Sequence, residues 1–187
     1  MVVQKKERWR EPYRTGQKAF TKKEFEKLMS VVGTLEDKIL LLLGVNTGMR
    51  RRDITSIEIA NIDLANSKMT YYEYKKRRMR TIFINSGLVL EIRIYLKTLP
   101  RGRKMLFSFK DRTAYNRLNK YCTLAGIPNR PFHALRATCI KFCQQAGWSP
   151  EEVSELTGDS IRVIQEHYAT PSMMEMKETT EKKPIWR

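Results

Sequence analysis

The amino-acid sequence predicts a single, mainly helical (α+β) domain with a small antiparallel β-sheet. Several segments carry apolar residues at helical spacing behind capping residues, and two neighbouring segments near the middle of the chain are rich in strand-forming residues. The chain has 187 residues, of which 41% are hydrophobic, and this is enough for one ordinary core. We find no internal repeat and no second core in the sequence.

Two helices and a short helical turn are expected in the first part of the chain. The segment Thr21-Lys22-Lys23-Glu24 has the pattern of a capping box, which predicts a helix over about 21–32. A second helix should begin behind Thr34, contain the longest apolar run of the sequence, and end near Gly48. A short turn of helix is expected from Arg50 onward.

The pattern then changes to that of β-strands. Aromatic and β-branched residues are frequent in segments 68–74 and 80–84, and the mainly basic segment 75–79 separates them. We therefore expect a β-hairpin, with a third strand near 59–64.

Helices return in the remainder of the chain. The segment Ser149-Pro150-Glu151-Glu152 combines a capping box with proline at the first helical position, and it predicts a helix of about eight residues. The other expected helices cover 87–98, 112–125, 132–145 and 160–168. The residues from Thr170 to the end are expected to have weak structure.

Charge is the strongest bulk property of the sequence. Lys and Arg number 36 against 20 Asp and Glu, which gives a formal net charge of +16. Such an excess attracts polyanions, because each neutralised phosphate releases condensed counterions. Nucleic acid is therefore the first class of partner and a membrane surface the second, and charge alone does not exclude a basic, ribosome-associated protein.

Several other classes of protein are not supported. No segment approaches the roughly 18 apolar residues of a membrane span, and the basic N-terminus does not resemble a secretory signal, so we expect a cytoplasmic or nucleoid location. The odd number of cysteines, Cys122, Cys139 and Cys143, does not predict a disulfide framework, and we expect these residues to pack in the core. Without a Walker-type phosphate loop, a His-Glu-x-x-His motif or a carboxylate cluster, we expect no metal and no cofactor.

Three segments in order resemble the sequence boxes of the tyrosine recombinases. Thr47-Gly48-Met49-Arg50-Arg51-Arg52-Asp53-Ile54 resembles their Thr-Gly-x-Arg-x-x-Glu box, and His133-Ala134-Leu135-Arg136 resembles their His-x-x-Arg box. Leu156-Thr157-Gly158-Asp159-Ser160, followed by Tyr168, resembles their Leu-x-Gly-His-x segment and terminal tyrosine. The basic hairpin lies between the first two boxes, where the family carries its lysine.

This resemblance implies the catalytic domain of a site-specific DNA recombinase or integrase with the tyrosine recombinase fold. The domain would cover 19–172, between a linker or arm at 1–18 and a C-terminal tail at 173–187. Members of the family usually carry an N-terminal DNA-clamping domain, so we expect this chain to be a catalytic fragment or a truncated recombinase. The implied reaction cleaves and rejoins DNA through a 3′-phosphotyrosine intermediate, without metal or ATP.

Five catalytic roles follow from the resemblance. Arg50 and Arg136 would hold the non-bridging oxygens of the scissile phosphate, a task that suits guanidinium groups because they bind oxyanions bidentately. His133 would position the phosphate and accept the proton of the nucleophile, Tyr168. The fifth residue, a lysine, would protonate the leaving 5′-oxygen.

The sequence leaves two candidates for this general acid. We prefer Lys75, because the family lysine typically ends the first strand and lies five residues before a basic residue that opens the second, here Arg80. A shift of the hairpin register would favour Lys76 instead.

Two acidic positions need separate interpretation. Asp159 stands where the family usually has a His or Trp that donates to the phosphate, and an ionised Asp cannot donate and would repel phosphate unless it is paired. Either Asp159 turns away and caps the last helix, or another residue such as His167 contributes. Asp53 matches the family acid that supports the first arginine, and it could equally be a solvated helix carboxylate.

Partners follow from the same resemblance. The basic residues beside the boxes are expected to contact the DNA backbone: Arg51, Arg52, Lys76, Arg77, Arg78 and Arg80. The working form would be a homo-tetramer on double-stranded DNA, and a monomer or weak oligomer alone, in the cytoplasm of a host cell. The unusual basic first box suggests a viral or plasmid integrase, such as that of an archaeal mobile element. The alternatives are a type IB topoisomerase-like nicking-closing enzyme and a catalytically inactive DNA-binding relative.

Overall fold

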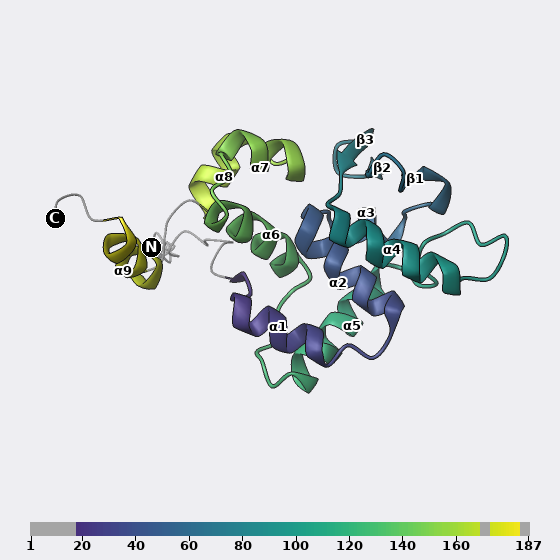
Figure 1. Ribbon diagram of the computed structural model, residues 1–187, viewed down its shortest axis with the longest axis horizontal. Coiled ribbons are helices and arrows are strands. Elements are labelled where there is room, and N and C mark those ends of the chain that lie inside the picture. The colour runs from purple at the N-terminus through teal and green to yellow at the C-terminus, as the bar shows by residue number, and fades with distance from the viewer. Residues whose placement is uncertain (1–17, 169–172, 184–187) are drawn as a thin grey trace, which may run out of the picture.

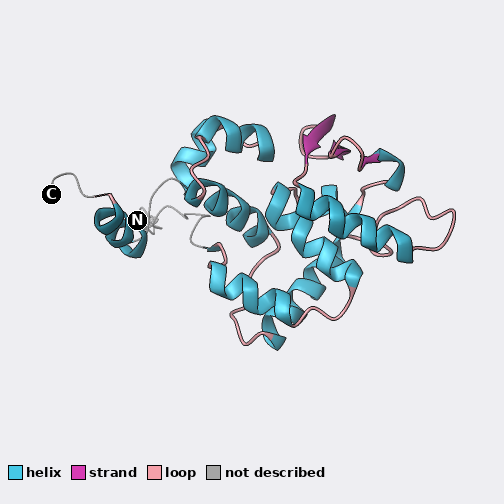
Figure 2. Cartoon of the chain, in the orientation of Figure 1, coloured by secondary structure: helices cyan, strands magenta, loops and turns pink. Residues whose placement is uncertain are grey.

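The structure is a computed structural model that describes residues 18–168 and 173–183 (Figure 1). Its elements are α1 (Lys22–Ser30), α2 (Leu35–Thr47), α3 (Arg51–Thr55), the 3-10 turn η2 (Ile59–Asn61), β1 (Ile62–Asp63), β2 (Lys68–Glu73), β3 (Arg78–Phe83), α4 (Ser86–Thr98), α5 (Asp111–Leu124), α6 (His133–Gln145), α7 (Pro150–Thr157), α8 (Ile161–Tyr168) and α9 (Met173–Lys182). Helices dominate, and the strands are confined to one small sheet (Figure 2). The predicted fold class is confirmed.

The predicted caps define the helix boundaries. Thr21 accepts a hydrogen bond from the backbone of Glu24 and the Glu24 side chain accepts one in return, so the capping box at the start of α1 is present. Thr34 caps α2, and Ser149 forms the second capping box at the start of α7. Helix α2 ends at Gly48, whose φ of +63° lies in the left-handed region that favours glycine.

The sheet has the order β1-β2-β3, and both pairs of neighbouring strands are antiparallel. Glu73 pairs with Arg78, so the loop of the hairpin contains only residues 74–77. The expected turn over 75–79 was therefore too long, and the second strand opens at Arg78 and not at Arg80. Arg77 adopts a left-handed φ of +50°, which closes the loop early enough for pairing to continue to Arg78.

Helix α2 lies at the centre of the core and packs against α3, α4, α5 and α6. At Gly44 it lies directly against α6, since an added Cβ would lie 2.7 Å from Cδ1 of Leu135. Helices α7 and α8 pack on α6 through a smaller apolar cluster of Ala137, Ile140, Val153 and Ile164. The core thus places the end of α2, the start of α6 and the loop between α7 and α8 next to one another.

The two ends of the chain differ from expectation in one respect. The weak structure expected after Thr170 is wrong for Met173–Lys182, which forms α9, since this segment is rich in the good helix formers Met, Glu and Lys. In Figure 1, α9 lies apart from the other helices. The arm expected at 1–18 lies, except for Lys18, outside the described residues. No helix in the described part of the chain is both long and apolar enough to span a membrane.

Candidate active site

Arg50 is positioned by the turn that follows α2. The left-handed conformation of Gly48 reverses the chain, and Arg50 then occupies the N-cap position of α3 in extended conformation. Its Nη1 donates to Oε1 of Glu73 at 2.7 Å, and its Nη2 donates to Oδ1 of Asp159 at 3.3 Å. The first expected arginine is therefore held between two carboxylates from distant parts of the chain.

Arg136 projects from the first turn of α6 and is almost completely buried. Its Nη1 donates to the carbonyl oxygen of Gly48, which joins α6 to the end of α2. Its Nε donates to Oδ2 of Asp159 at 2.9 Å, and its Nη2 lies 2.7 Å from Oδ1 of the same carboxylate. Arg50 and Arg136 therefore meet at a single anion, although they are far apart in sequence.

This geometry corrects the expectations for Asp159. The carboxylate does not turn away, and α8 is capped by Ser160, whose Oγ accepts a hydrogen bond from the backbone nitrogen of Val163 at 3.3 Å. Asp159 instead binds both arginines, because its negative charge compensates two guanidinium groups that have largely left water. Asp159 lies directly after Gly158, which ends α7 with a φ of +76°.

Glu73 supports Arg50 in the role expected of Asp53. Glu73 is fully buried at the end of β2 and accepts hydrogen bonds from Arg50 and from Nε of Arg78, the latter at 3.1 Å. Burial tends to raise the pKa of Glu73, but the hydrogen bonds from both arginines outweigh burial, and the net pKa is lowered. Met69, Tyr71 and Glu73 alternate on the buried face of β2, so a charged residue in that pattern was the signal for this role.

Asp53 has a different part in the site. Its Oδ1 accepts a hydrogen bond from the backbone nitrogen of Tyr74 at 3.2 Å, which fixes the start of the hairpin loop against α3. Asp53 is buried, so the alternative of a solvated helix carboxylate is also wrong. Desolvation raises its pKa, although the hydrogen bond from Tyr74 and the charge of Arg50 oppose the increase.

The basic residues of the hairpin differ in their surroundings, since some face solvent and others bind groups of the protein. Lys75, Lys76 and Arg77 are exposed, and Nζ of Lys76 also donates to the carbonyl oxygen of Gly158 at 2.6 Å. Arg80 is buried and donates to the hydroxyl of Tyr71 at 3.2 Å, so its expected contact with the DNA backbone is contradicted. The inward alternation of β3 explains this burial, because Arg80 pairs with the inward-facing Tyr71.

His133 is the first residue of α6 and its side chain is exposed to the neighbouring cleft. Partial desolvation lowers the pKa of its imidazole, and the charges of Arg136, Arg50 and Lys75 lower it further, while that of Asp159 opposes them. The neutral form, which can accept a proton, is therefore favoured near neutral pH.

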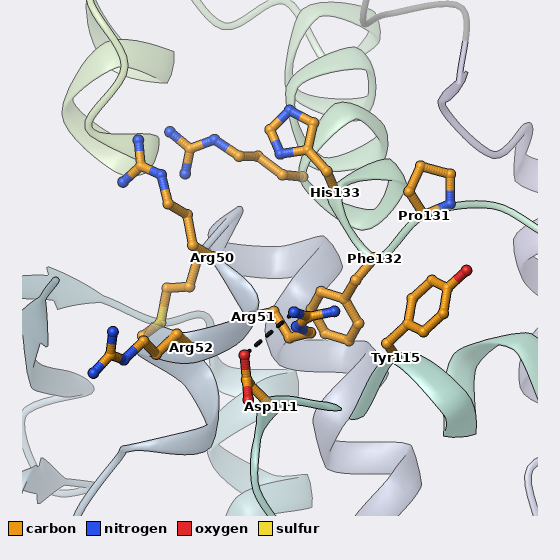
Figure 3. A pocket seen from close by; sticks show the side chains of 10 residues that line it. Arg50, Arg51, Arg52, Asp111, Tyr115, Pro131, Phe132 and His133 are labelled. Carbon is orange, nitrogen blue, oxygen red and sulfur yellow. Dashed lines mark hydrogen bonds and ion pairs between the residues drawn. The ribbon is translucent and has the colours of Figure 1, made fainter. Parts of the chain in front are cut away.

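The cleft beside these residues has a volume of about 390 Å³. Figure 3 shows Arg50 and His133 at one end of it and Asp111 and Tyr115 at the other. Arg51 also lines it, with Nη2 3.2 Å from Oδ2 of Asp111. The cleft is lined by Met49, Arg50, Arg51, Arg52, Asp111, Tyr115, Pro131, Phe132, His133 and Arg136.

Arg52 and the remaining expected residues lie around this centre. The guanidinium of Arg52 stacks over the ring of Tyr74 with 4.0 Å between its Cζ and the ring centroid. Tyr168 and His167 end α8, the helix that packs on α6, but their side chains lie outside the described residues. The three cysteines are free thiols, of which Cys122 and Cys139 are buried as expected. Two guanidinium groups and an acceptor imidazole line one cleft, and the nearby hairpin carries exposed lysines. These groups are suited to bind a phosphodiester and transfer protons at it.

Comparison with known proteins gives a consistent result. The sequence matches the phage integrase family over residues 18–175. It is 27% identical to the tyrosine recombinase XerA of Pyrococcus horikoshii over 174 residues, which cover 88% of this chain and 61% of that protein. It is also 27% identical to the tyrosine recombinase XerA of Saccharolobus solfataricus over 141 residues, which cover 75% of this chain and 48% of that protein.

Solved structures agree in fold. A crystal structure of XerA recombinase superimposes with a TM-score of 0.78 at 17% identity, and covers 90% of this chain and 66% of that one. A structure of the XerH site-specific recombinase bound to its difH substrate before cleavage gives a TM-score of 0.69 at 17% identity, with 91% and 54% covered. The chain thus spans about half to two thirds of the length of these relatives.

Proposed function

The chain belongs to the phage integrase family, and from this premise we propose that it is the catalytic part of a site-specific DNA recombinase. It would cleave and rejoin double-stranded DNA through a 3′-phosphotyrosine intermediate, without metal or ATP. The observation that carries the proposal is the convergence of Arg50 and Arg136 on one anion beside His133.

Two arginines around one anion match the electrostatic demand of phosphoryl transfer. The pentacoordinate transition state carries more negative charge on its non-bridging oxygens than the ground state does, and fixed donors aimed at those oxygens stabilise it. A guanidinium group also keeps its proton under all ordinary conditions. The bond from Arg136 to the carbonyl of Gly48 and the bond from Arg50 to Glu73 hold both groups in place before the substrate arrives.

The proposed step exchanges one phosphoester for another. The Oη of Tyr168 attacks phosphorus, a bond forms between tyrosine and the 3′-phosphate, and the bond to the 5′-oxygen breaks. His133 accepts the proton of Tyr168, and a lysine gives a proton to the leaving 5′-oxygen. Because the phosphotyrosine retains a phosphoester bond, the same groups acting in reverse rejoin the strand.

We assign the general acid to Lys75. The amine of Lys76 is held by the carbonyl oxygen of Gly158, whereas the charge of Lys75 acts on the imidazole of His133. The spacing from Lys75 to Arg80 no longer supports this choice, because the second strand opens at Arg78 and not at Arg80. The preference for Lys75 now rests on these contacts.

The partner and assembly are part of the same proposal. The exposed side chains of Arg52, Lys76, Arg77 and Arg78 and the partly exposed Arg51 surround the cleft and hairpin and would contact DNA backbone. The relatives of known structure include a recombinase bound to its DNA substrate. We propose that residues 19–172 form the catalytic domain, that four copies act together on DNA, and that the protein works beside the host's DNA in the cytoplasm.

The test is the formation of a covalent protein–DNA species. The full chain is incubated without metal with a pool of labelled duplexes of random sequence. Each duplex carries a nick, so that a strand once cleaved cannot be rejoined. A slower band on a denaturing gel is expected for the wild-type chain and should be absent in Tyr168→Phe. No covalent band from a chain that binds the duplexes would contradict the proposal and would leave a DNA-binding relative without activity.

The role of Lys75 has its own readout. Lys75→Ala should lose cleavage of ordinary DNA but recover it on a duplex with sulfur in place of the 5′-bridging oxygen, because a thiolate leaves without being protonated. Lys76→Ala is the matched variant and should show no selective rescue by sulfur. Rescue of Lys76→Ala alone would reassign the general acid.

A further inference from the structure

We propose that the carboxylate of Asp159 occupies the phosphate position between Arg50 and Arg136 in the free chain, and that the scissile phosphate must displace it. Asp159 would thus be an internal gate of the active site. The identity of the displacing anion, a DNA phosphodiester, rests on the proposed function. The gate itself rests on the contacts of Asp159.

The contacts of Asp159 are those that a bound phosphodiester would make. Its Oδ2 accepts from Nε of Arg136 at 2.9 Å, and its Oδ1 lies 2.7 Å from Nη2 of Arg136 and 3.3 Å from Nη2 of Arg50. The two carboxylate oxygens thus bind two nitrogens of Arg136 and one nitrogen of Arg50. A phosphodiester also presents two charged oxygens on one centre, so both anions need the same donors and cannot hold them together.

Burial explains why the position has to be filled. The side chain of Arg136 is 2% exposed and that of Asp159 is 15% exposed, so both charges have largely left water. An uncompensated buried cation is strongly unfavourable, and one negative charge beside it removes most of that cost. The entering phosphate can supply the same compensation, so displacement exchanges one anion for another.

The backbone around Asp159 is held independently of its side chain. The carbonyl oxygen of Asp159 accepts a hydrogen bond from Oγ of Ser154 at 2.7 Å, and its nitrogen donates to Oγ1 of Thr157 at 3.4 Å. The preceding carbonyl, that of Gly158, is held by Lys76 at 2.6 Å. The gate therefore opens by rotation of one side chain, while the start of α8, the helix that ends with Tyr168, stays in place.

The gate gives the site a way to distinguish DNA from free phosphate. An isolated phosphate has to displace Asp159 with its own charge alone. A phosphate within a duplex is brought to the cleft by further contacts with the basic residues around it, such as Arg77 and Arg78, and these contacts add to its affinity. The family usually has a hydrogen-bond donor at the position of Asp159. A donor there would not distinguish DNA from free phosphate, since it would attract both.

Inorganic phosphate is the probe for this proposal, and its binding is followed by nuclear magnetic resonance on the guanidinium Nε–H of Arg136 in the full chain. Asp159→Asn keeps the size of the side chain and removes its charge, so phosphate should bind at least about tenfold more tightly than to the wild type. Asp111→Asn is the matched control, because it removes one negative charge from the cleft that Arg50 and Arg136 line. It should change the affinity by less than about threefold, as its partner is Arg51.

Two results would overturn the gate. One is phosphate affinity in Asp159→Asn that is equal to or weaker than in the wild type, or raised no more than in Asp111→Asn. The other uses only the wild-type chain: if saturating phosphate shifts the Arg136 signal while the carboxyl carbon of Asp159 keeps its chemical shift, no exchange occurs. The second measurement decides the matter even if the variant fails to fold.

The outcome is separable from that of the proposed function. Phosphate binding needs neither Tyr168 nor strand cleavage, so a gate can be established in a chain that forms no covalent species. Conversely, a covalent species lost in Tyr168→Phe would stand even if Asp159 were found not to move.

Discussion

Gly158→Ala tests how closely the hairpin fits the loop between α7 and α8. Gly158 has a φ of +76°, and a Cβ built on it would lie 2.6 Å from Nη1 and 3.1 Å from Cζ of Arg80. Arg80 is only 9% exposed and donates to Tyr71, so its guanidinium has little freedom to withdraw. The alanine side chain would therefore push the loop and the hairpin apart.

The expected loss of stability has two parts. Placing a side chain in left-handed conformation costs roughly 1–2 kcal/mol. Overpacking a site that cannot relax adds about 1–3 kcal/mol. Gly126→Ala is the matched control, because Gly126 has a φ of +64° and an added Cβ would meet no atom within 4 Å. It should show the first part alone.

Urea unfolding of both variants at neutral pH measures the difference. Gly158→Ala should be less stable than Gly126→Ala by about 1–3 kcal/mol. The slope of the unfolding free energy against urea concentration should be the same in both variants. If the free energies of unfolding of the two variants agree within about 0.5 kcal/mol, Arg80 gives way easily and the reasoning about a tight fit is refuted.

Two further predictions concern titrating groups. Glu73→Gln should reduce the free energy of unfolding by about 2 kcal/mol at neutral pH, because Arg50 and Arg78 lose an ionised partner. A lowered carboxyl pKa stabilises the fold above the unfolded value near 4.5, and this stabilisation is lost as the pH falls through the folded pKa. The difference in unfolding free energy between wild type and variant should therefore disappear in acid. Urea unfolding at several pH values measures this difference, and a value that does not change with pH would contradict the assignment. The pKa of His133 should lie below 6.5 in the free chain, since desolvation and Arg136 lower it, and it should fall further in Asp159→Asn, since Asp159 raises it. Titration of the ring protons of His133 by nuclear magnetic resonance tests both statements. A pKa at or above 6.5 in the wild-type chain would refute the first.

The sequence was sufficient for features that depend on neighbouring residues. The capping boxes at Thr21 and Ser149 and the glycine that ends α2 obey rules that act within one helical turn, so they could be predicted without knowledge of the fold. The hairpin was predicted for the same reason, although its loop is shorter than expected because Arg77 adopts a left-handed conformation. Such a conformation in a non-glycine residue is not encoded in the strand pattern.

The partners of the charged residues could not be predicted in this way. Arg50 and Asp159 are 109 positions apart in the chain, and their contact depends on how α2, α6 and α7 pack. The role of Glu73 depends likewise on which face of β2 is buried beside Arg50. Local rules identify which residues are unusual, while tertiary packing decides which of them meet.

The seam between α2 and α6 has a consequence for how such a protein can diverge. Gly44 lies against Leu135, and Gly48 accepts the hydrogen bond from Arg136, so both arginines belong to one rigid frame. Arg77 and Met79, which are exposed on the hairpin, stand outside that frame. Substitutions at these two positions can therefore alter which DNA is read while the reacting centre is inherited unchanged, whereas any enlargement at Gly44 would disturb the centre for every target at once.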